Sequence, residues 1–234
     1  MAYLEGKNLV ASYGVVPILH ECSVEVEKGE LAVIVGPNGA GKSTVMRVLL
    51  GMLDATEGSV TLDGKDISML STQDRIAQGL AFVPQTKNVF PSMTVEENLQ
   101  MGGFIREDDI SKTIEEVYEL FPILYEKRKQ LAEELSGGQR QQVAFGRAMM
   151  TRPSVMLLDE PTAGVSPIVM DEIFSNILDV RNAGMAVLMV EQNAQQALNI
   201  ADKGFVLVSG RNEHTGTGKE LIEDREVRKK FLGG

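Results

Sequence analysis

A glycine-rich segment near the start of the chain has the composition and spacing of a phosphate-binding loop. Residues 36–44 read GPNGAGKST, which fits the pattern G-x-x-x-x-G-K-[ST]. The glycines allow successive backbone N–H groups to curl around phosphate oxygens, where a side chain would block the approach. Lys42 would add a positive charge near the β- and γ-phosphates, and the Ser43 hydroxyl would be a ligand for Mg²⁺. The predicted loop residues are Gly36, Pro37, Asn38, Gly39, Ala40, Gly41, Lys42, Ser43 and Thr44.

A glycine-rich surface turn is the alternative interpretation of this segment. The apolar run LAVIV at 31–35 precedes the motif, and apolar residues at helical spacing follow it. A strand before the loop and a helix after it are what phosphate binding requires, because the start of the helix adds its own positive field. The context therefore favours nucleotide binding.

Two acidic residues follow a second apolar segment, VMLLDE at 155–160. A strand that ends in Asp159 can present a carboxylate to Mg²⁺, usually through a water molecule. Glu160 can orient or deprotonate an attacking water. A strand that ends in two solvated acids is common, so this motif gains its meaning from the loop at Lys42. Together the two motifs predict a site that binds a nucleotide with Mg²⁺ and hydrolyses it.

The string LSGGQ at 135–139 is the third motif. Five specified residues in this order arise by chance in about one chain in a thousand of this size. Ser136 stands where a helix N-cap belongs, ahead of a helical pattern that reaches residue 148, and a capped helix start is a second site for anions. An ordinary capped helix would not explain why the string lies between a phosphate loop and an aspartate strand.

Segments of strand type alternate with helical segments along the chain, which favours an α/β layer architecture. Alternating residues typical of a half-buried antiparallel strand occur near the N-terminus, at Ile18, His20, Cys22, Val24 and Val26. Continuous apolar runs, typical of strands buried on both faces, occur at 31–35, 80–83, 155–158, 186–190 and 205–208.

A region without a convincing strand pattern begins at Thr94. Thr94 followed by Glu97 is typical of a capping box that opens a helix. Apolar residues between 110 and 121 share one helical face, and Pro122 is expected to stop that helix. We therefore predict a helical subdomain at 91–149, inserted into a nucleotide-binding core formed by 1–90 and 150–234.

Composition excludes several classes of protein. The 234 residues carry 33 acidic and 23 basic side chains, a net charge of −10 that argues against broad binding to nucleic acid. The single cysteine, Cys22, excludes an internal disulfide framework and a cysteine-rich zinc site. No apolar run approaches the ~20 residues needed to span a bilayer, and residues 1–8 lack the pattern of a signal peptide. The chain is therefore expected to be cytosolic.

With these motifs the chain resembles the ATP-binding cassette (ABC) ATPases over essentially its whole length. GPNGAGKST is similar to their Walker A motif, VMLLDE to their Walker B motif, and LSGGQ to their signature motif. Gln85 matches the glutamine of their Q-loop, and Tyr13 matches the aromatic residue that stacks on adenine, although a core tyrosine fits the composition equally well. The resemblance implies an α/β fold with a P-loop NTPase (RecA-like) core, an N-terminal antiparallel β subdomain and an inserted helical subdomain, in one domain at 1–234.

The resemblance also implies how a site of this kind works. Two cassettes pair head to tail, and the signature motif of each closes over the ATP of the other. Ser43, Gln85 and Asp159 would place Mg²⁺, while Glu160 would act on the attacking water. The residues implied for contact with the partner's nucleotide are Ser136, Gly137, Gly138 and Gln139.

Two positions depart from the general family pattern. Gln192 follows the strand at 186–190, where the family usually has a histidine that contacts the γ-phosphate. Gln192 can still donate a hydrogen bond to a phosphate or a water, but it carries no titratable charge near neutral pH. Ser166 stands where an aspartate commonly closes the loop after Walker B, which puts communication between the two sites through that loop in doubt.

Three strings are similar to one branch of the family, the ATPase subunits of bacterial branched-chain amino acid importers: DEPTAGVSP (159–167), VEQNAQQAL (190–198) and VRKKFLGG (227–234). Importers of urea and short amides are close to that branch. The resemblance implies a heterodimer with a second, histidine-bearing ATPase subunit, a homodimer being the alternative. It also implies transmembrane permease subunits that contact residues 86–94, an extracytoplasmic (periplasmic or extracellular) solute-binding protein, and a peripheral location on the inner face of the membrane.

Two further functions remain open at this point. A non-transport ABC ATPase that acts in DNA repair or on the ribosome would usually carry tandem cassettes or a long insert, and this chain has neither. A nucleotide-binding regulator without hydrolysis is the other, since Gln192 and Ser166 can mark a weakened site.

Overall fold

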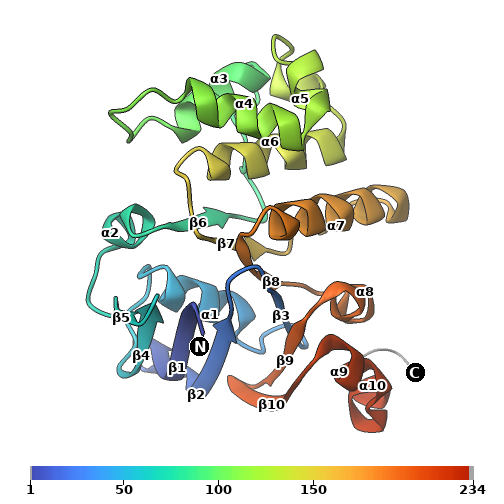
Figure 1. Cartoon of the computed structure of the whole chain (residues 1–234). Coiled ribbons are helices and arrows are strands. Elements are labelled where there is room, and N and C mark those ends of the chain that lie inside the picture. Colours follow the sequence, from blue (N-terminus) through green and yellow to red (C-terminus); the bar gives the residue numbers. More distant parts are fainter. Residues whose placement is uncertain (1, 232–234) are drawn as a thin grey trace.

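Two β-sheets and a block of helices make up the structure, a computed structural model that describes residues 2–231 (Figure 1). The strands are β1 (Leu4–Tyr13), β2 (Val16–Val26), β3 (Leu31–Val35), β4 (Glu57–Leu62), β5 (Lys65–Asp66), β6 (Leu80–Val83), β7 (Val155–Asp159), β8 (Ala186–Val190), β9 (Lys203–Val208) and β10 (Arg211–Gly216). The helices are α1 (Lys42–Leu49), α2 (Thr72–Ala77), α3 (Val95–Gly102), α4 (Ser111–Leu120), α5 (Pro122–Glu126), the 3₁₀ turn η1 (Ala132–Glu134), α6 (Gly137–Met149), α7 (Pro167–Asn182), α8 (Ala194–Ile200), α9 (Gly218–Glu223) and α10 (Arg225–Phe231). The last residues of VRKKFLGG, 232–234, lie outside the described part of the chain.

The larger sheet has the strand order β10-β9-β3-β8-β7-β6, and all its neighbouring strands are parallel except the pair β9 and β10. Its central strand β3 is fully buried because both faces are covered. Leu31, Val33 and Val35 join the cluster that includes residues of α6 and α7. Ala32 and Ile34 join a second cluster with α1 and the smaller sheet. Burial on two faces explains why the strand reads as a continuous apolar run.

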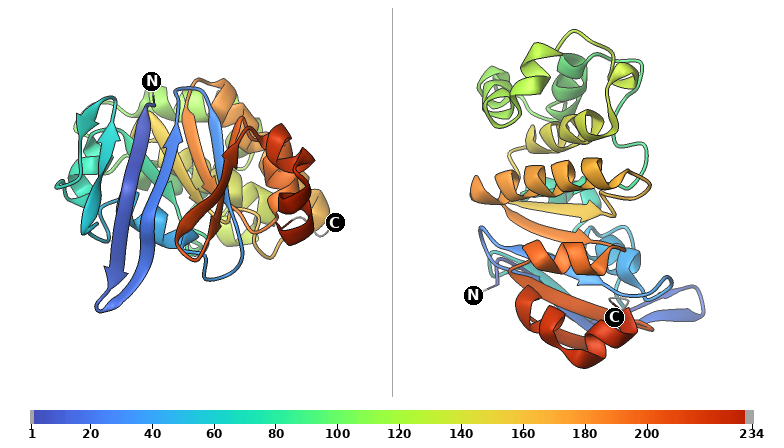
Figure 2. Two further views of the ribbon diagram at one scale, coloured as in Figure 1. Left: turned by 90° about the horizontal axis from the view of Figure 1, so that it is seen from below. Right: turned by 90° about the vertical axis from the view of Figure 1, so that its right-hand side faces the viewer.

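The smaller sheet is antiparallel, with the order β2-β1-β4-β5, and Figure 2 shows it beside the larger sheet. The predicted alternation along β2 is correct only from Cys22 onward. The backbone at Glu21 has a φ of +59°, and the register with β1 shifts on either side of it. Leu19 is therefore the buried residue before this bulge, and the side chains of Ile18 and His20 are only partly buried.

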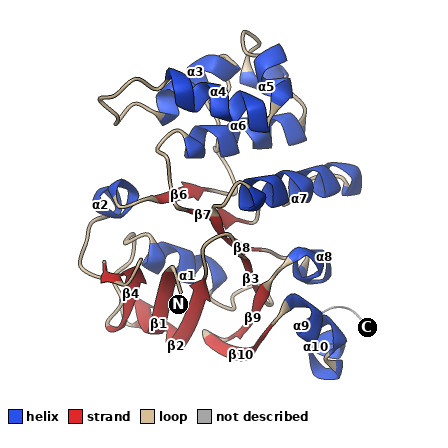
Figure 3. Cartoon of the chain, in the orientation of Figure 1, coloured by secondary structure: helices blue, strands red, loops and turns tan. Residues whose placement is uncertain are grey.

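Helices α3 to α6 form a block at one end of the molecule, free of named strands (Figures 1 and 3). Thr94 caps α3 in the predicted capping box with Glu97. The prediction for Pro122 is incomplete: α4 ends at Leu120 as expected, but Pro122 is the first residue of α5. Proline suits the first helical position because its missing N–H has no partner there. The subdomain boundaries at 91 and 149 stay a prediction.

Within residues 2–231, no helix combines the length and the apolar character needed to cross a membrane.

A buried arginine closes the end of α1. Arg75 is only 3% exposed, and its guanidinium donates to the carbonyl oxygens of Val48 and Leu49 at 2.7 and 2.8 Å. The same side chain donates to Leu70 O at 3.1 Å and Ser68 O at 2.6 Å. One side chain thus satisfies carbonyl groups at the end of α1 and in the segment before α2.

Replacing Arg75 with alanine should lower the free energy of unfolding by about 3 kcal/mol, because several buried carbonyl groups lose their donor. Urea denaturation measures the change. Arg225→Ala removes an exposed arginine and should stay within about 0.5 kcal/mol of the wild type. Equal stability of the two variants would show that the hydrogen bonds of Arg75 do not stabilise the fold.

Candidate active site

The loop between β3 and α1 is held in a conformation that needs glycine. Gly36 has a φ of +151°, and a Cβ atom there would lie 2.1 Å from the carbonyl oxygen of Leu207 in β9. Gly41, with a φ of +100°, is the N-cap of α1 and lies against the side chain of Leu19. The loop therefore packs against β9 and β2, and it leads directly into the first turn of α1, where N–H groups have no partner within the helix.

Lys42 folds back over this loop. Its Nζ donates to the carbonyl oxygens of Gly36 at 2.9 Å and Pro37 at 3.2 Å. Burial lowers the pKa of Lys42, while the nearby carboxylates of Glu160, Asp159 and Glu191 act in the opposite direction. The loop thus carries an ammonium group whose present partners are neutral carbonyls, which an anionic ligand can replace.

The acidic residues after β7 lie next to the loop. Ser43 Oγ donates to Asp159 Oδ1 at 3.4 Å, and burial raises the pKa of Asp159. Gln85 Nε2 donates to Glu160 Oε2 at 3.1 Å. Glu160 has a φ of +45°, uncommon for a residue with a side chain, and its N–H donates to Val190 O at 2.9 Å. A cavity of about 250 Å³ is lined by Ile18, Asn38, Gly39, Ala40, Gly41, Lys42, Ser43, Thr44 and Glu160.

The donors at this cavity suit a magnesium ion that is held mainly by phosphates and water. Mg²⁺ prefers hard oxygen ligands and usually takes only one or two from the protein. The hydroxyl of Ser43 and the carboxylate of Asp159 are two such oxygens in hydrogen-bond distance of each other. Between residues 2 and 231, no group of three or more His, Cys, Asp or Glu side chains forms a metal cage.

One buried carboxylate was not assigned a role by the sequence analysis. Glu191, at the end of β8, is 1% exposed, and its Oε1 accepts from the N–H and the hydroxyl of Thr162 at 3.0 and 2.8 Å. Its Oε2 accepts from the N–H of Gln192 at 3.0 Å. Burial raises the pKa of Glu191. Glu191 thus ties the end of β8 to the loop after Glu160, and its position directly after an apolar strand was a signal for it.

Several predicted residues lie outside the loop cavity. Gln192 lines a neighbouring cavity of about 380 Å³ together with Gly36, Pro37 and Lys230. The Tyr13 hydroxyl accepts from Arg47 Nη1 at 2.8 Å, and the residue is 40% exposed.

The LSGGQ segment is also separate from this cavity. Ser136 is the N-cap of α6, as predicted, and the structure adds a capping box with Gln139. None of Ser136, Gly137, Gly138 and Gln139 lines the loop cavity.

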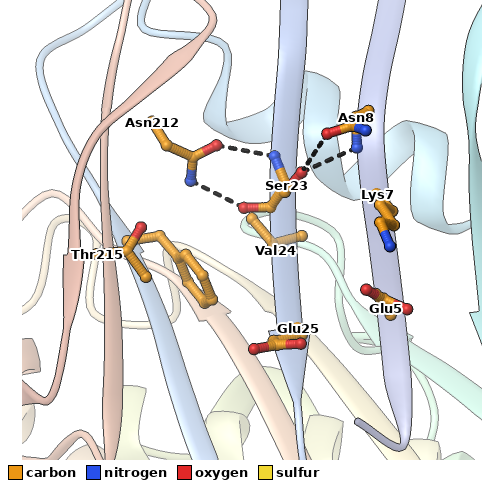
Figure 4. Close-up of a pocket in the computed structure, with 10 residues that line it drawn as sticks. Glu5, Lys7, Asn8, Ser23, Val24, Glu25, Asn212 and Thr215 are labelled. Atoms are coloured by element: carbon orange, nitrogen blue, oxygen red, sulfur yellow. Dashed lines mark hydrogen bonds between the residues drawn. The ribbon is translucent and has the colours of Figure 1, made fainter.

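A larger cavity, of about 400 Å³, lies between β1, β2 and β10 (Figure 4). Three of its polar residues, Asn8, Ser23 and Asn212, already pair with one another. The side-chain amide of Asn212 bonds both the N–H and the carbonyl of Ser23, each at 2.8 Å, and Ser23 Oγ accepts from the N–H of Asn8 at 2.8 Å. The cavity at the loop, which combines backbone donors, a lysine and carboxylates, is therefore the candidate active site.

Comparison with known proteins agrees with this geometry. Residues 19–163 match the ABC transporter family. The chain belongs to this family. The branched-chain amino acid transport ATP-binding protein BraG of Pseudomonas aeruginosa is 44% identical over 223 residues, which cover 95% of this chain and 96% of BraG. The probable branched-chain amino acid transport ATP-binding protein LivF of Archaeoglobus fulgidus is 38% identical over 228 residues, with 97% of each chain covered.

Two further matches are an export protein and a solved structure. The lipopolysaccharide export ATP-binding protein LptB of Haemophilus influenzae is 34% identical over 237 residues, which cover 100% of this chain and 98% of LptB. A crystal structure of an ATP-binding cassette of an ABC transporter in its ADP conformation superposes with a TM-score of 0.90, at 31% identity and with both chains fully covered. The predicted fold class is confirmed, and the chain is an ABC ATPase that binds adenine nucleotides.

The raised pKa of Asp159 predicts a stability effect that depends on pH. The folded protein holds this proton more tightly than the unfolded chain, so the ionised carboxylate destabilises the fold once the pH exceeds the raised pKa. Without nucleotide or Mg²⁺, Asp159→Asn should therefore raise Tm at pH 7. The gain should shrink as the pH falls through that pKa.

Thermal unfolding followed by circular dichroism measures this gain. Asp179→Asn changes an exposed carboxylate of α7 and should leave Tm unchanged. A lower Tm for Asp159→Asn at pH 7 would contradict the prediction.

Proposed function

We propose that this chain is the ATP-hydrolysing subunit of an ABC importer that takes up branched-chain amino acids. The observation that supports the solute class is the 44% identity to BraG across nearly the full length of both chains. The observation that supports the chemistry is the cavity lined by Lys42, Ser43 and Glu160, beside which Asp159 accepts a hydrogen bond from Ser43.

The loop amides and Lys42 hold the phosphates in this proposal. Exchange of the Gly36 and Pro37 carbonyls for phosphate oxygens gives the ammonium of Lys42 a charged partner. Ser43, Asp159 and Gln85 would hold Mg²⁺, which would neutralise charge on the phosphates. Glu160 accepts a proton from the attacking water, and its hydrogen bond to Gln85 keeps the carboxylate oriented before the substrate arrives.

The remaining residues act around this centre. Tyr13 stacks on adenine after release from Arg47, and Gln192 donates to the γ-phosphate side of the site. Ser136, Gly137, Gly138 and Gln139 cover the nucleotide of a second cassette. Their separation from the loop cavity of their own chain is consistent with action across a dimer.

The proposal includes partners of several kinds. A second ABC ATPase subunit forms a dimer with this chain, a heterodimer in the first instance. Transmembrane permease subunits dock at residues 86–94, and an extracytoplasmic solute-binding protein delivers the solute to them. The chain then lies on the inner face of the membrane, and nucleic acid has no role.

Export is the second candidate function, because LptB matches over the full chain at 34% identity. The identity to BraG is ten percentage points higher, which favours uptake of amino acids. A transporter of urea or short amides fits the same active site, since the solute does not touch this subunit. A non-transport ABC ATPase has the least support, because the matched relatives are described as transport or export proteins.

Glu160→Gln keeps the shape of the side chain and removes the base. ATP affinity measured by calorimetry should be retained, while steady-state hydrolysis should fall between about a hundredfold and ten-thousandfold. Glu119→Gln, an exposed change of the same type on α4, should hydrolyse ATP at the wild-type rate. Unchanged hydrolysis by Glu160→Gln would remove Glu160 from its role.

The same two variants test the transported solute in cells. Cells that carry Glu160→Gln should lose uptake of labelled leucine, isoleucine and valine, and cells that carry Glu119→Gln should keep it. Normal amino acid uptake with a loss of lipopolysaccharide export, or of urea uptake, would assign the alternative function.

A further inference from the structure

Two contacts between side-chain amides join helix α6 to the segment after β6 and to α7. Asn88 Nδ2 donates to Gln141 Oε1 at 2.9 Å, and Gln142 Nε2 donates to Asn176 Oδ1 at 3.2 Å. Gln141, Gln142 and Asn176 are all buried. Both glutamines lie just beyond the first turn of α6, the turn that begins at the LSGGQ segment.

One contact leads to the segment that carries Gln85, and the other leads to the middle of α7, downstream of Glu160. Asn88 is three residues beyond Gln85, whose side chain donates to Glu160. Asn176 lies on α7, the helix that follows the loop from Glu160. The start of α6 is therefore hydrogen-bonded on one side to the segment of Gln85, whose side chain contacts Glu160, and on the other side to the middle of α7.

These amides are only partly satisfied. Three buried atoms have no hydrogen-bond partner: Gln141 Nε2, Gln142 Oε1 and Asn176 Nδ2. Two facing amides can form two reciprocal bonds, yet Gln142 and Asn176 form one. A buried polar atom without a partner costs about 1–3 kcal/mol, and apolar side chains of similar size would avoid that cost. Stability of this arrangement alone does not account for four amides here.

We propose that Asn88, Gln141, Gln142 and Asn176 are positioning residues, which set the LSGGQ helix relative to Gln85 and Glu160. Amides suit this role because a small rotation exchanges one donor or acceptor for another without moving a charge. This inference rests on the proposed function, in which the LSGGQ segment covers the nucleotide of a partner subunit.

The double variant Gln142→Met with Asn176→Leu tests the proposal. It removes one hydrogen bond and two unpaired atoms at nearly constant side-chain volume, so the free energy of unfolding should be unchanged or higher. The Kd and KM for ATP should stay within about twofold of the wild type, because neither residue lines the loop cavity. We expect kcat to fall about tenfold, since the groups act on the geometry of the reaction.

Asn88→Ala is the second variant, and it should show the same loss of kcat at unchanged KM. Asn88 lies in a loop and is only half-buried, so this change does not endanger folding. Tyr118→Phe is the matched control, because it removes another unpaired buried group, the hydroxyl of Tyr118. The ring of Tyr118 packs edge-on against the ring of Tyr125 in the helical block. Tyr118→Phe should turn over as the wild type.

The outcomes separate this proposal from the proposed function. Wild-type kcat in both the double variant and Asn88→Ala would overturn the positioning role. A fall in kcat that parallels a fall in stability or ATP affinity would also overturn it, because the role would then be structural. Absence of hydrolysis by the wild-type protein, or full hydrolysis by Glu160→Gln in the same assay, would instead overturn the proposed function.

Discussion

Burial of β3 on both faces determines where the phosphate-binding loop begins. Val35, the last residue of the strand, is fully buried, and the next residue, Gly36, passes so close to Leu207 that no side chain fits. The N–H of Gly210 donates to the carbonyl of Ala40 at 2.9 Å, which fastens the middle of the loop to the same part of the larger sheet. The loop therefore inherits its position from the sheet, and the direction of α1 follows from the loop.

The acidic groups of the site share this origin. Asp159 is the last residue of β7, and Glu191 directly follows β8. Both strands are parallel to β3: β8 is its neighbour in the sheet, and β7 lies one strand further out. Parallel strands bring such ends to one edge of a sheet, where ligands of α/β proteins bind. Lys42 adds a positive charge at the same edge. Its ammonium group interacts in a partly buried space with three carboxylates, those of Asp159, Glu160 and Glu191. The site thus contains charges of both signs, so that substrate phosphates can pair with the lysine and a metal ion can pair with the carboxylates.

The elements of the larger sheet could be predicted from the sequence because each is recorded in local apolar runs. The strands at 31–35, 80–83 and 186–190 have the predicted bounds. The bulge at Glu21 could not be predicted. It changes which residues of β2 face the core, and it depends on pairing with β1 rather than on the local alternation of residues. The loop and Walker B motifs were visible as strings, and the structure brings Asn38 to Thr44 together with Glu160 at one cavity.

Contacts between distant segments account for what the sequence did not reveal. The bond from Arg47 to Tyr13, and the amide pairs of α6, join side chains 34 or more residues apart. No periodicity or spacing encodes such pairs, because they depend on how whole elements pack. Glu191 is intermediate: its place after a buried strand is visible in the sequence, but its two bonds to Thr162 are not.

The side chain of Asn212 has a consequence for the surface of the protein. β2 and β10 are edge strands of two different sheets, and exposed strand edges invite pairing with another chain. Asn212 imitates a strand by bonding both backbone groups of Ser23, and further along the N–H of His20 donates to Gly210 O at 2.9 Å. Each edge thereby shields the other from intermolecular β-sheet growth. Two open sheets acquire at this seam a protection against aggregation that a closed barrel obtains by having no edges.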